Sequence, residues 1–139
     1  MSSNSSARGN PLLEAAGYWL PVLAWMGLIF LTSSRSNLPS APEPLLDVLI
    51  KKTLHFTAYG ILAFWWWRAL SHAGLAGRWA VLGGLLAAVL YATSDEFHQT
   101  FVPDRHGQLQ DVMIDSAGAA LASVLIWRKL RVVSGPGGG

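Results

Sequence analysis

Four long apolar stretches constrain the fold of this chain more than any other sequence feature. They cover residues 12–32, 48–70, 79–93 and 112–127, and polar or proline-containing connections separate them. None of them alternates with the two-residue period of a strand. A helix needs about 20 residues to cross a hydrocarbon core about 30 Å thick, so polar residues must complete the last three spans. We therefore predict an all-α fold, a bundle of four transmembrane helices.

Composition favours a membrane over a soluble bundle. Hydrophobic residues make up 52% of the 139 residues and charged residues only 13%, about half of the roughly 25% found in soluble domains. A soluble four-helix bundle is the alternative, but its helices need polar faces, which WAVLGGLLAAVLYAT and FTAYGILAFWWW lack. The net charge of +2 is too small and scattered to indicate a nucleic-acid partner. The absence of cysteine excludes disulfides and cysteine nucleophiles.

A single domain is expected over residues 11–133. The polar tail 1–10 and the glycine-rich tail 134–139 are expected to be disordered. An alternative for the first stretch, which follows Arg8, is a cleaved signal peptide. Small residues four apart allow helix backbones to approach closely. They predict tight packing between the third and fourth helices, through the pairs Gly83–Ala87, Gly84–Ala88 and Gly118–Ala122.

Lysines and arginines indicate the orientation in the cell membrane. The N-terminal segment, the second connection and the C-terminus carry Arg8, Arg68, Arg78, Arg128, Lys129 and Arg131. The first and third connections carry fewer, namely Arg35, Lys51, Lys52 and Arg105. Because positive residues are enriched in cytoplasmic loops, we predict a multi-pass protein with both termini in the cytoplasm.

In this topology the unusual polar residues converge at the extracytoplasmic end. The second stretch enters through KKTLHFTAY, where Lys51 and Lys52 stand four and three before His55, and His55 stands four before Tyr59. These residues are therefore expected to share a helix face. The third stretch ends in SDEFHQ, in which Asp95, His98 and Gln99 share a face with Glu96 beside it.

The same end receives the third connection and the start of the fourth stretch. FVPDRHGQ carries Arg105, and the fourth stretch begins with Asp111 and Asp115, four residues apart. Ionisable groups at membrane depth cost several kcal/mol unless they are paired or face a cavity, so they indicate a functional site. Structural roles are the alternatives: Asp111 as a helix N-cap, and His55 and His98 as hydrogen-bonding residues between helices.

Three segments resemble the signature blocks of the VanZ-like family. They are SSRSNLP, KKTLHFTAYG and SDEFHQTFVPDRHGQLQDVMIDSAGA. Two positions depart from the family pattern: Lys51 stands where Asp is more frequent, and Asp104 where Gly is usual. By position, the resemblance carries over the motif residues Ser34, Lys52, His55, Tyr59, Asp95, Glu96, His98, Gln99, Arg105, Asp111 and Asp115.

The resemblance implies a small integral membrane protein. The family's namesake is associated with low-level resistance to teicoplanin, a lipid-tailed glycopeptide, rather than to vancomycin. The leading hypothesis is an outer-leaflet polar pocket that engages an anionic or sugar-bearing amphiphile, either an envelope lipid or a lipid-tailed glycopeptide. A role in teicoplanin-type resistance would follow from that binding. The predicted ligand-binding residues are Ser34, Lys52, His55, Tyr59, Gln99, Arg105, Asp111 and Asp115.

Two alternatives to ligand binding are kept. One is a membrane-embedded hydrolase or transferase on a lipid-linked envelope substrate, with Glu96, His98 and Asp95 as catalytic residues. The other is a charge network that only holds the helix ends together. No metal or cofactor is assigned, and a divalent metal held by histidines and carboxylates is the alternative. Oligomeric state and enzymatic activity are left open.

Overall fold

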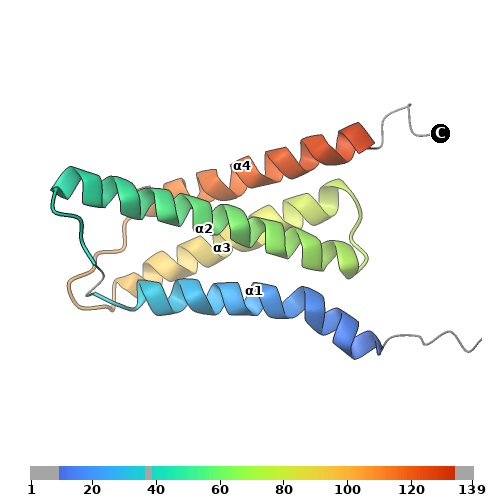
Figure 1. Ribbon diagram of the computed structural model, residues 1–139, viewed down its shortest axis with the longest axis horizontal. Coiled ribbons are helices and arrows are strands. Elements are labelled where there is room, and N and C mark those ends of the chain that lie inside the picture. Colours follow the sequence, from blue (N-terminus) through green and yellow to red (C-terminus); the bar gives the residue numbers. More distant parts are fainter. Residues whose placement is uncertain (1–9, 37–38, 134–139) are drawn as a thin grey trace, which may run out of the picture.

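The computed structural model describes residues 10–36 and 39–133 and is all-helical over these ranges (Figure 1). The helices are α1 (Pro11–Ser33), α2 (Pro44–His72), α3 (Arg78–Gln99) and α4 (Leu109–Val133). The prediction of an all-α fold with four helices is confirmed. The expected disorder concerns residues 1–9 and 134–139, which lie outside the described residues. Asn10, assigned to the N-terminal tail, instead caps α1, because its side-chain oxygen accepts a hydrogen bond from Leu12 N at 3.0 Å.

The helices run up and down, so the connections alternate between two ends of the bundle (Figure 1). The α1–α2 and α3–α4 connections lie at one end, which we call the polar end. The α2–α3 connection and the last residues of α4 lie at the other. Four helix ends therefore meet at the polar end, as the sequence predicts. They are the end of α1, the start of α2, the end of α3 and the start of α4. Helix α2 contacts all three other helices, and its most extensive contact is with α4.

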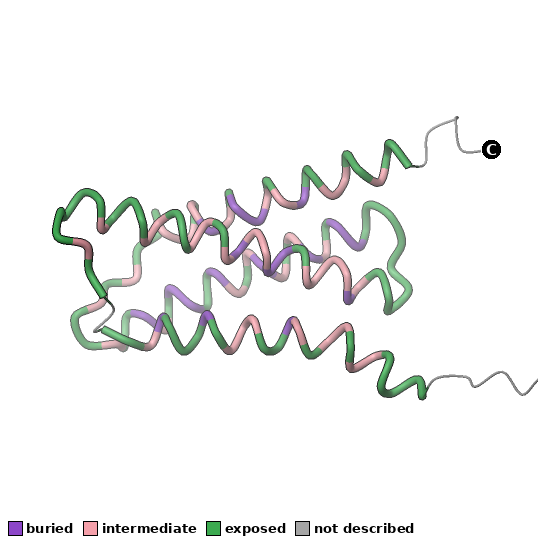
Figure 2. Tube along the Cα trace, in the orientation of Figure 1, coloured by how far each residue is buried: buried purple, intermediate pink, exposed green. Residues whose placement is uncertain are grey.

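Small side chains fill much of the interior, and large apolar side chains face outward. Four of the seven buried core residues are alanines, and Tyr59 and Leu62 are the largest members of the core; the full cluster is Ile29, Tyr59, Leu62, Ala63, Ala88, Ala92 and Ala119. Leu86 and Leu90 are 60% and 61% exposed, and exposed residues recur along the outer faces of the helices (Figure 2). A soluble protein rarely exposes so much apolar surface, whereas lipid accommodates it.

Three helices, rather than the expected four, are long and apolar enough to cross a membrane. Among the described residues these candidate spans are α1, α3 and α4. Helix α2 has the length, but Lys51, Lys52, His55 and Arg68 lower its hydropathy. Because α2 contacts all three other helices, less of its surface has to be compatible with lipid.

The predicted small-residue contacts occur, but their partner is α2. A side-chain carbon at Gly84 would lie 2.9 Å from Trp67 N and 3.0 Å from Ala63 O, both in α2. A side-chain carbon at Gly118 would collide with the carbonyl group of Phe56, also in α2. Helices α3 and α4 do contact each other. The expectation that these glycines join α3 to α4 is nevertheless wrong, because both lie against the central helix.

A proline in α1 creates a hydrogen-bond acceptor for α2. Pro21 has no backbone N–H, so it cannot make the helical hydrogen bond to the carbonyl oxygen of Gly17. The guanidinium of Arg68 donates to that oxygen at 3.1 Å and also lies over the ring of Tyr18. The gap in the α1 hydrogen-bond ladder thereby helps to attach α1 to α2.

Candidate functional site

The polar end gathers side chains from all four helices and from the α3–α4 connection. None of the predicted site residues is fully exposed to solvent. The half-buried ones are Ser34, Lys52, His55, His98, Arg105 and Asp111. The buried ones are Tyr59, Asp95, Glu96, Gln99 and Asp115.

Gln99 connects two buried carboxylates to the arginine of the α3–α4 connection. Its Nε2 donates to Asp95 Oδ2 at 3.3 Å and to Glu96 Oε1 at 3.2 Å. Its Oε1 accepts a hydrogen bond from Arg105 Nη1 at 3.1 Å. Gln99 therefore links Arg105 to the acidic pair through hydrogen bonds.

Ser33 is a member of the site that the sequence analysis missed. Its hydroxyl donates to Asp95 Oδ2 at 2.7 Å, and the residue is 1% exposed. The available signal was helical spacing, because Ser33 follows the buried Ile29 by four residues and so lies on the inward face of α1. The family pattern drew attention to the adjacent Ser34 instead.

Two side-chain contacts, about one helical turn apart, join α2 to α4. Lys52 Nζ contacts Asp111 Oδ1 at 2.5 Å, and His55 Nδ1 lies 3.4 Å from the carboxylate of Asp115. The spacing of these contacts follows from the sequence, because residues three apart on α2 and four apart on α4 each lie on one helix face. Lys51 instead pairs at 2.7 Å with Asp47 in its own helix. Its positive charge is therefore balanced within α2 and takes no part in the contacts with α4.

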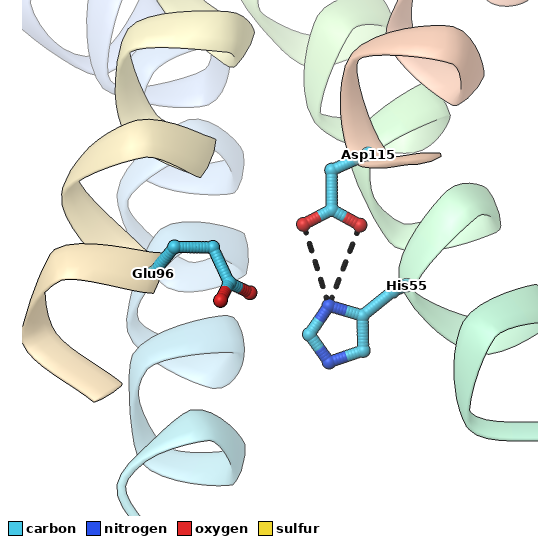
Figure 3. Close-up of side chains that lie close together, drawn as sticks. All are labelled: His55, Glu96 and Asp115. Carbon is cyan, nitrogen blue, oxygen red and sulfur yellow. Dashed lines mark hydrogen bonds and ion pairs between the residues drawn. The ribbon is translucent and has the colours of Figure 1, made fainter. Parts of the chain in front are cut away.

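His98 lies on the α1 side of the cluster. Its Nε2 is 3.1 Å from Ser34 Oγ, and its ring packs against Phe30. Because the Ser34 hydroxyl donates to the Phe30 carbonyl at 2.7 Å, the histidine is the donor in this contact. The histidine that accompanies Glu96 is His55, which meets Glu96 and Asp115 in one group (Figure 3). The catalytic role of His98 with Glu96 and Asp95 in the enzyme alternative stays a prediction.

The α3–α4 connection is held by hydrogen bonds to the α1–α2 connection and to α3. Arg105 Nη2 donates to the carbonyl of Arg35 at 3.0 Å, and Gln108 N donates to Glu96 Oε2 at 3.0 Å. Asp104 has a φ of 60°. This left-handed region explains why glycine suits the position, and Asp is one of the few other residues that adopt it readily.

An apolar groove lies beside the cluster. It has a volume of about 340 Å³ and is lined by Met26, Trp66, Ala87, Leu90, Tyr91 and Ser94. These residues come from α1, α2 and α3, and Ser94 directly precedes Asp95. Along α3, the groove therefore extends to the residue before Asp95.

The model of the VanZ/LLP1 family matches residues 18–131, which include α2 and α3, most of α1 and α4, and the whole polar end. The chain belongs to the VanZ/LLP1 family. The resemblance seen in the three sequence blocks is confirmed, and family membership and the apolar helices together support an integral membrane protein. Comparison with curated proteins and with solved structures gave no match.

Proposed function

We propose that this VanZ/LLP1 protein binds an anionic or sugar-bearing amphiphile at the polar end. The observation that carries the proposal is a rim of half-buried cationic and hydrogen-bonding groups, formed by Lys52, His55 and Arg105. This rim adjoins the buried carboxylates of the polar end. The side chains of Lys52 and His55 are 32% and 31% exposed. Polar groups at membrane depth are costly unless they have a polar partner, so a headgroup is a reasonable ligand for this rim.

Unused hydrogen-bond donors support an anionic ligand. The Lys52 ammonium has three N–H donors, and its contact with Asp111 uses one of them. The Arg105 guanidinium has five donors, and its contacts with Gln99 and Arg35 use two. Both groups can therefore bind phosphate or carboxylate oxygens without giving up their present partners.

The adjoining groove supports an amphiphile over a water-soluble anion. Its lining is almost entirely apolar, and its last residue along α3 is Ser94. An acyl chain in this groove would place its headgroup near the polar end. The amphiphile is an envelope lipid in the absence of drug, and the lipid tail of teicoplanin would allow the same mode of binding. With both termini in the cytoplasm, the polar end would face the outer leaflet.

Two neighbouring lysines provide the matched test of this proposal. In native mass spectrometry, wild-type protein is expected to retain phosphatidylglycerol more than phosphatidylcholine. Lys52→Gln is expected to remove most of that preference, and Lys51→Gln to keep it, because Asp47 already neutralises Lys51. Equal loss in both variants, or no preference in the wild type, would contradict headgroup binding at this rim.

The resistance role is tested in cells at matched membrane abundance of the variants. Wild-type protein and Lys51→Gln are expected to protect against teicoplanin but not vancomycin, and Lys52→Gln to lose that protection. No protection by any of the three proteins would remove the resistance role. If Lys52→Gln instead lowers thermal stability while lipid preference persists, the cluster acts as a structural charge network.

Close contact among His55, Glu96 and Asp115 favours one second candidate function. Their ligand atoms lie within 4.8 Å of one another, so an imidazole and two carboxylates could perform acid and base chemistry on a lipid-linked envelope substrate. Incubation of purified protein with envelope lipids, followed by mass spectrometry, would then reveal a product. The same incubation with Glu96→Gln is expected to yield none.

A further inference from the structure

Three helices bring one nitrogen and two carboxylate groups to a common point. His55 projects from α2, Glu96 from α3 and Asp115 from α4, and they face one another (Figure 3). One atom from each residue lies within 4.8 Å of the other two. These residues are far apart in sequence, so the sequence shows no local metal-binding motif.

The negative charge at this point is poorly balanced. Asp95, Glu96 and Asp115 are 3%, 5% and 0% exposed. In residues 10–36 and 39–133, lysine ion pairs reach only Asp47 and Asp111, and His55 is the one basic group paired with a buried carboxylate. Burying carboxylates without a cation is unfavourable.

Asp115 provides a separate observation that indicates a ligand. It is fully buried, and its Oδ1 has no hydrogen-bond donor among the described residues. Both of its oxygens point toward His55 (Figure 3). Unsatisfied buried oxygens are uncommon in proteins, and an ion is one of the explanations.

We propose that His55, Glu96 and Asp115 bind one divalent transition-metal ion, of the class of Zn²⁺ or Mn²⁺. Imidazole and carboxylate together suit such ions. Two ligands about 2.1 Å from a tetrahedral ion are roughly 3.4 Å apart, and His55 Nδ1 lies 3.4 Å from Asp115 Oδ1. Ligands across an ion are at most about 4.2 Å apart, so side-chain rotation of Glu96 can close the remaining gap.

This inference departs from the expectation of no metal and does not depend on amphiphile binding. The half-exposed ring of His55 gives the site an open side toward the rim. A metal with three protein ligands keeps a position for water or for an anionic oxygen. The cation would neutralise the buried carboxylates and offer that position at the place where the sequence-derived site residues meet.

The test is binding of Zn²⁺ and Mn²⁺ alone to the purified full chain in detergent after chelator treatment. The wild type is expected to bind one ion per chain in equilibrium dialysis. Glu96→Gln is expected to weaken binding by about tenfold or more, as losses at metal sites do. The matched control Asp47→Asn removes a carboxylate at the same end and is expected to bind like the wild type.

A second measurement needs no variant in the cluster. Bound Zn²⁺ is expected to protect His55, but not His72 or His106, from diethyl pyrocarbonate, as read by peptide mass spectrometry. Binding far below one ion per chain for both metals in folded wild-type protein would overturn the proposal. Equal affinity in Glu96→Gln, or unprotected His55 at saturating metal, would overturn it as well. Because no lipid is present, none of these results depends on the proposed amphiphile.

Discussion

Ser33 and Ser34 are neighbours in sequence, and their hydroxyl groups have different partners. Ser33 donates to the buried carboxylate of Asp95, whereas Ser34 donates to the carbonyl of Phe30 in its own helix. A hydrogen bond to a buried charged group is worth more than one at a half-exposed helix end. At the scale of single residues, exposure and partner therefore decide which serine matters for stability.

We expect Ser33→Ala to destabilise the protein by about 1–3 kcal/mol, because Asp95 Oδ2 loses its closest donor. Ser34→Ala is the control and is expected to cost less than about 1 kcal/mol. Thermal unfolding of both variants in the same detergent measures the difference. Unfolding temperatures lowered equally by the two substitutions would show that the Ser33–Asp95 contact has no special weight.

Glycines determine how close α4 lies to α2. The backbone of Gly118 lies so near Phe56 that a methyl group does not fit, and a side-chain carbon at Gly60 would lie 3.2 Å from Gly118 O. This close approach brings Asp111 and Asp115 within reach of Lys52 and His55. At the scale of helices, the glycine contact thus positions one half of the polar site.

Gly118→Ala is expected to destabilise the protein by about 1–3 kcal/mol, because the added methyl group forces α2 and α4 apart. In α1, the control Gly27→Ala meets no atom within 4 Å and is expected to be neutral or stabilising by up to about 1 kcal/mol. Thermal unfolding of the two variants provides the comparison. A stable Gly118→Ala protein would show that the helices adjust at little cost.

In the whole molecule, successive helix connections lie at opposite ends of the bundle. The α1–α2 and α3–α4 connections form the polar end, and the α2–α3 connection lies at the other end with the last residues of α4 (Figure 1). Outward-facing leucines between these ends are suited to lipid. The bundle therefore has an axis along which it can cross the bilayer.

Single cysteines test this arrangement, because the chain has no cysteine of its own. His106→Cys, in the exposed α3–α4 connection, is expected to react with a membrane-impermeant maleimide in intact cells. Ala73→Cys, in the exposed α2–α3 connection, is expected to react only after the cells are opened. The reverse pattern would place the polar end in the cytoplasm, and labelling of both residues in intact cells would contradict a bundle that spans the membrane.

The sequence alone determined the helices, the end at which the polar residues meet, and the family. Apolar length predicts each helix, and spacing of three or four residues predicts which side chains share a face, because both depend on the geometry of one helix. Lys52 with His55, and Asp111 with Asp115, were predictable in this way. The spacing within a helix does not identify which neighbouring helix the face meets.

Only the tertiary structure decided which residues of different helices contact one another. It placed α2 at the centre, directed Gly84 and Gly118 toward it, and brought His55 rather than His98 to Glu96. These contacts join residues several tens of positions apart, and they depend on how whole helices pack. Single faces are set by local backbone geometry, whereas their pairing is a property of the packed bundle.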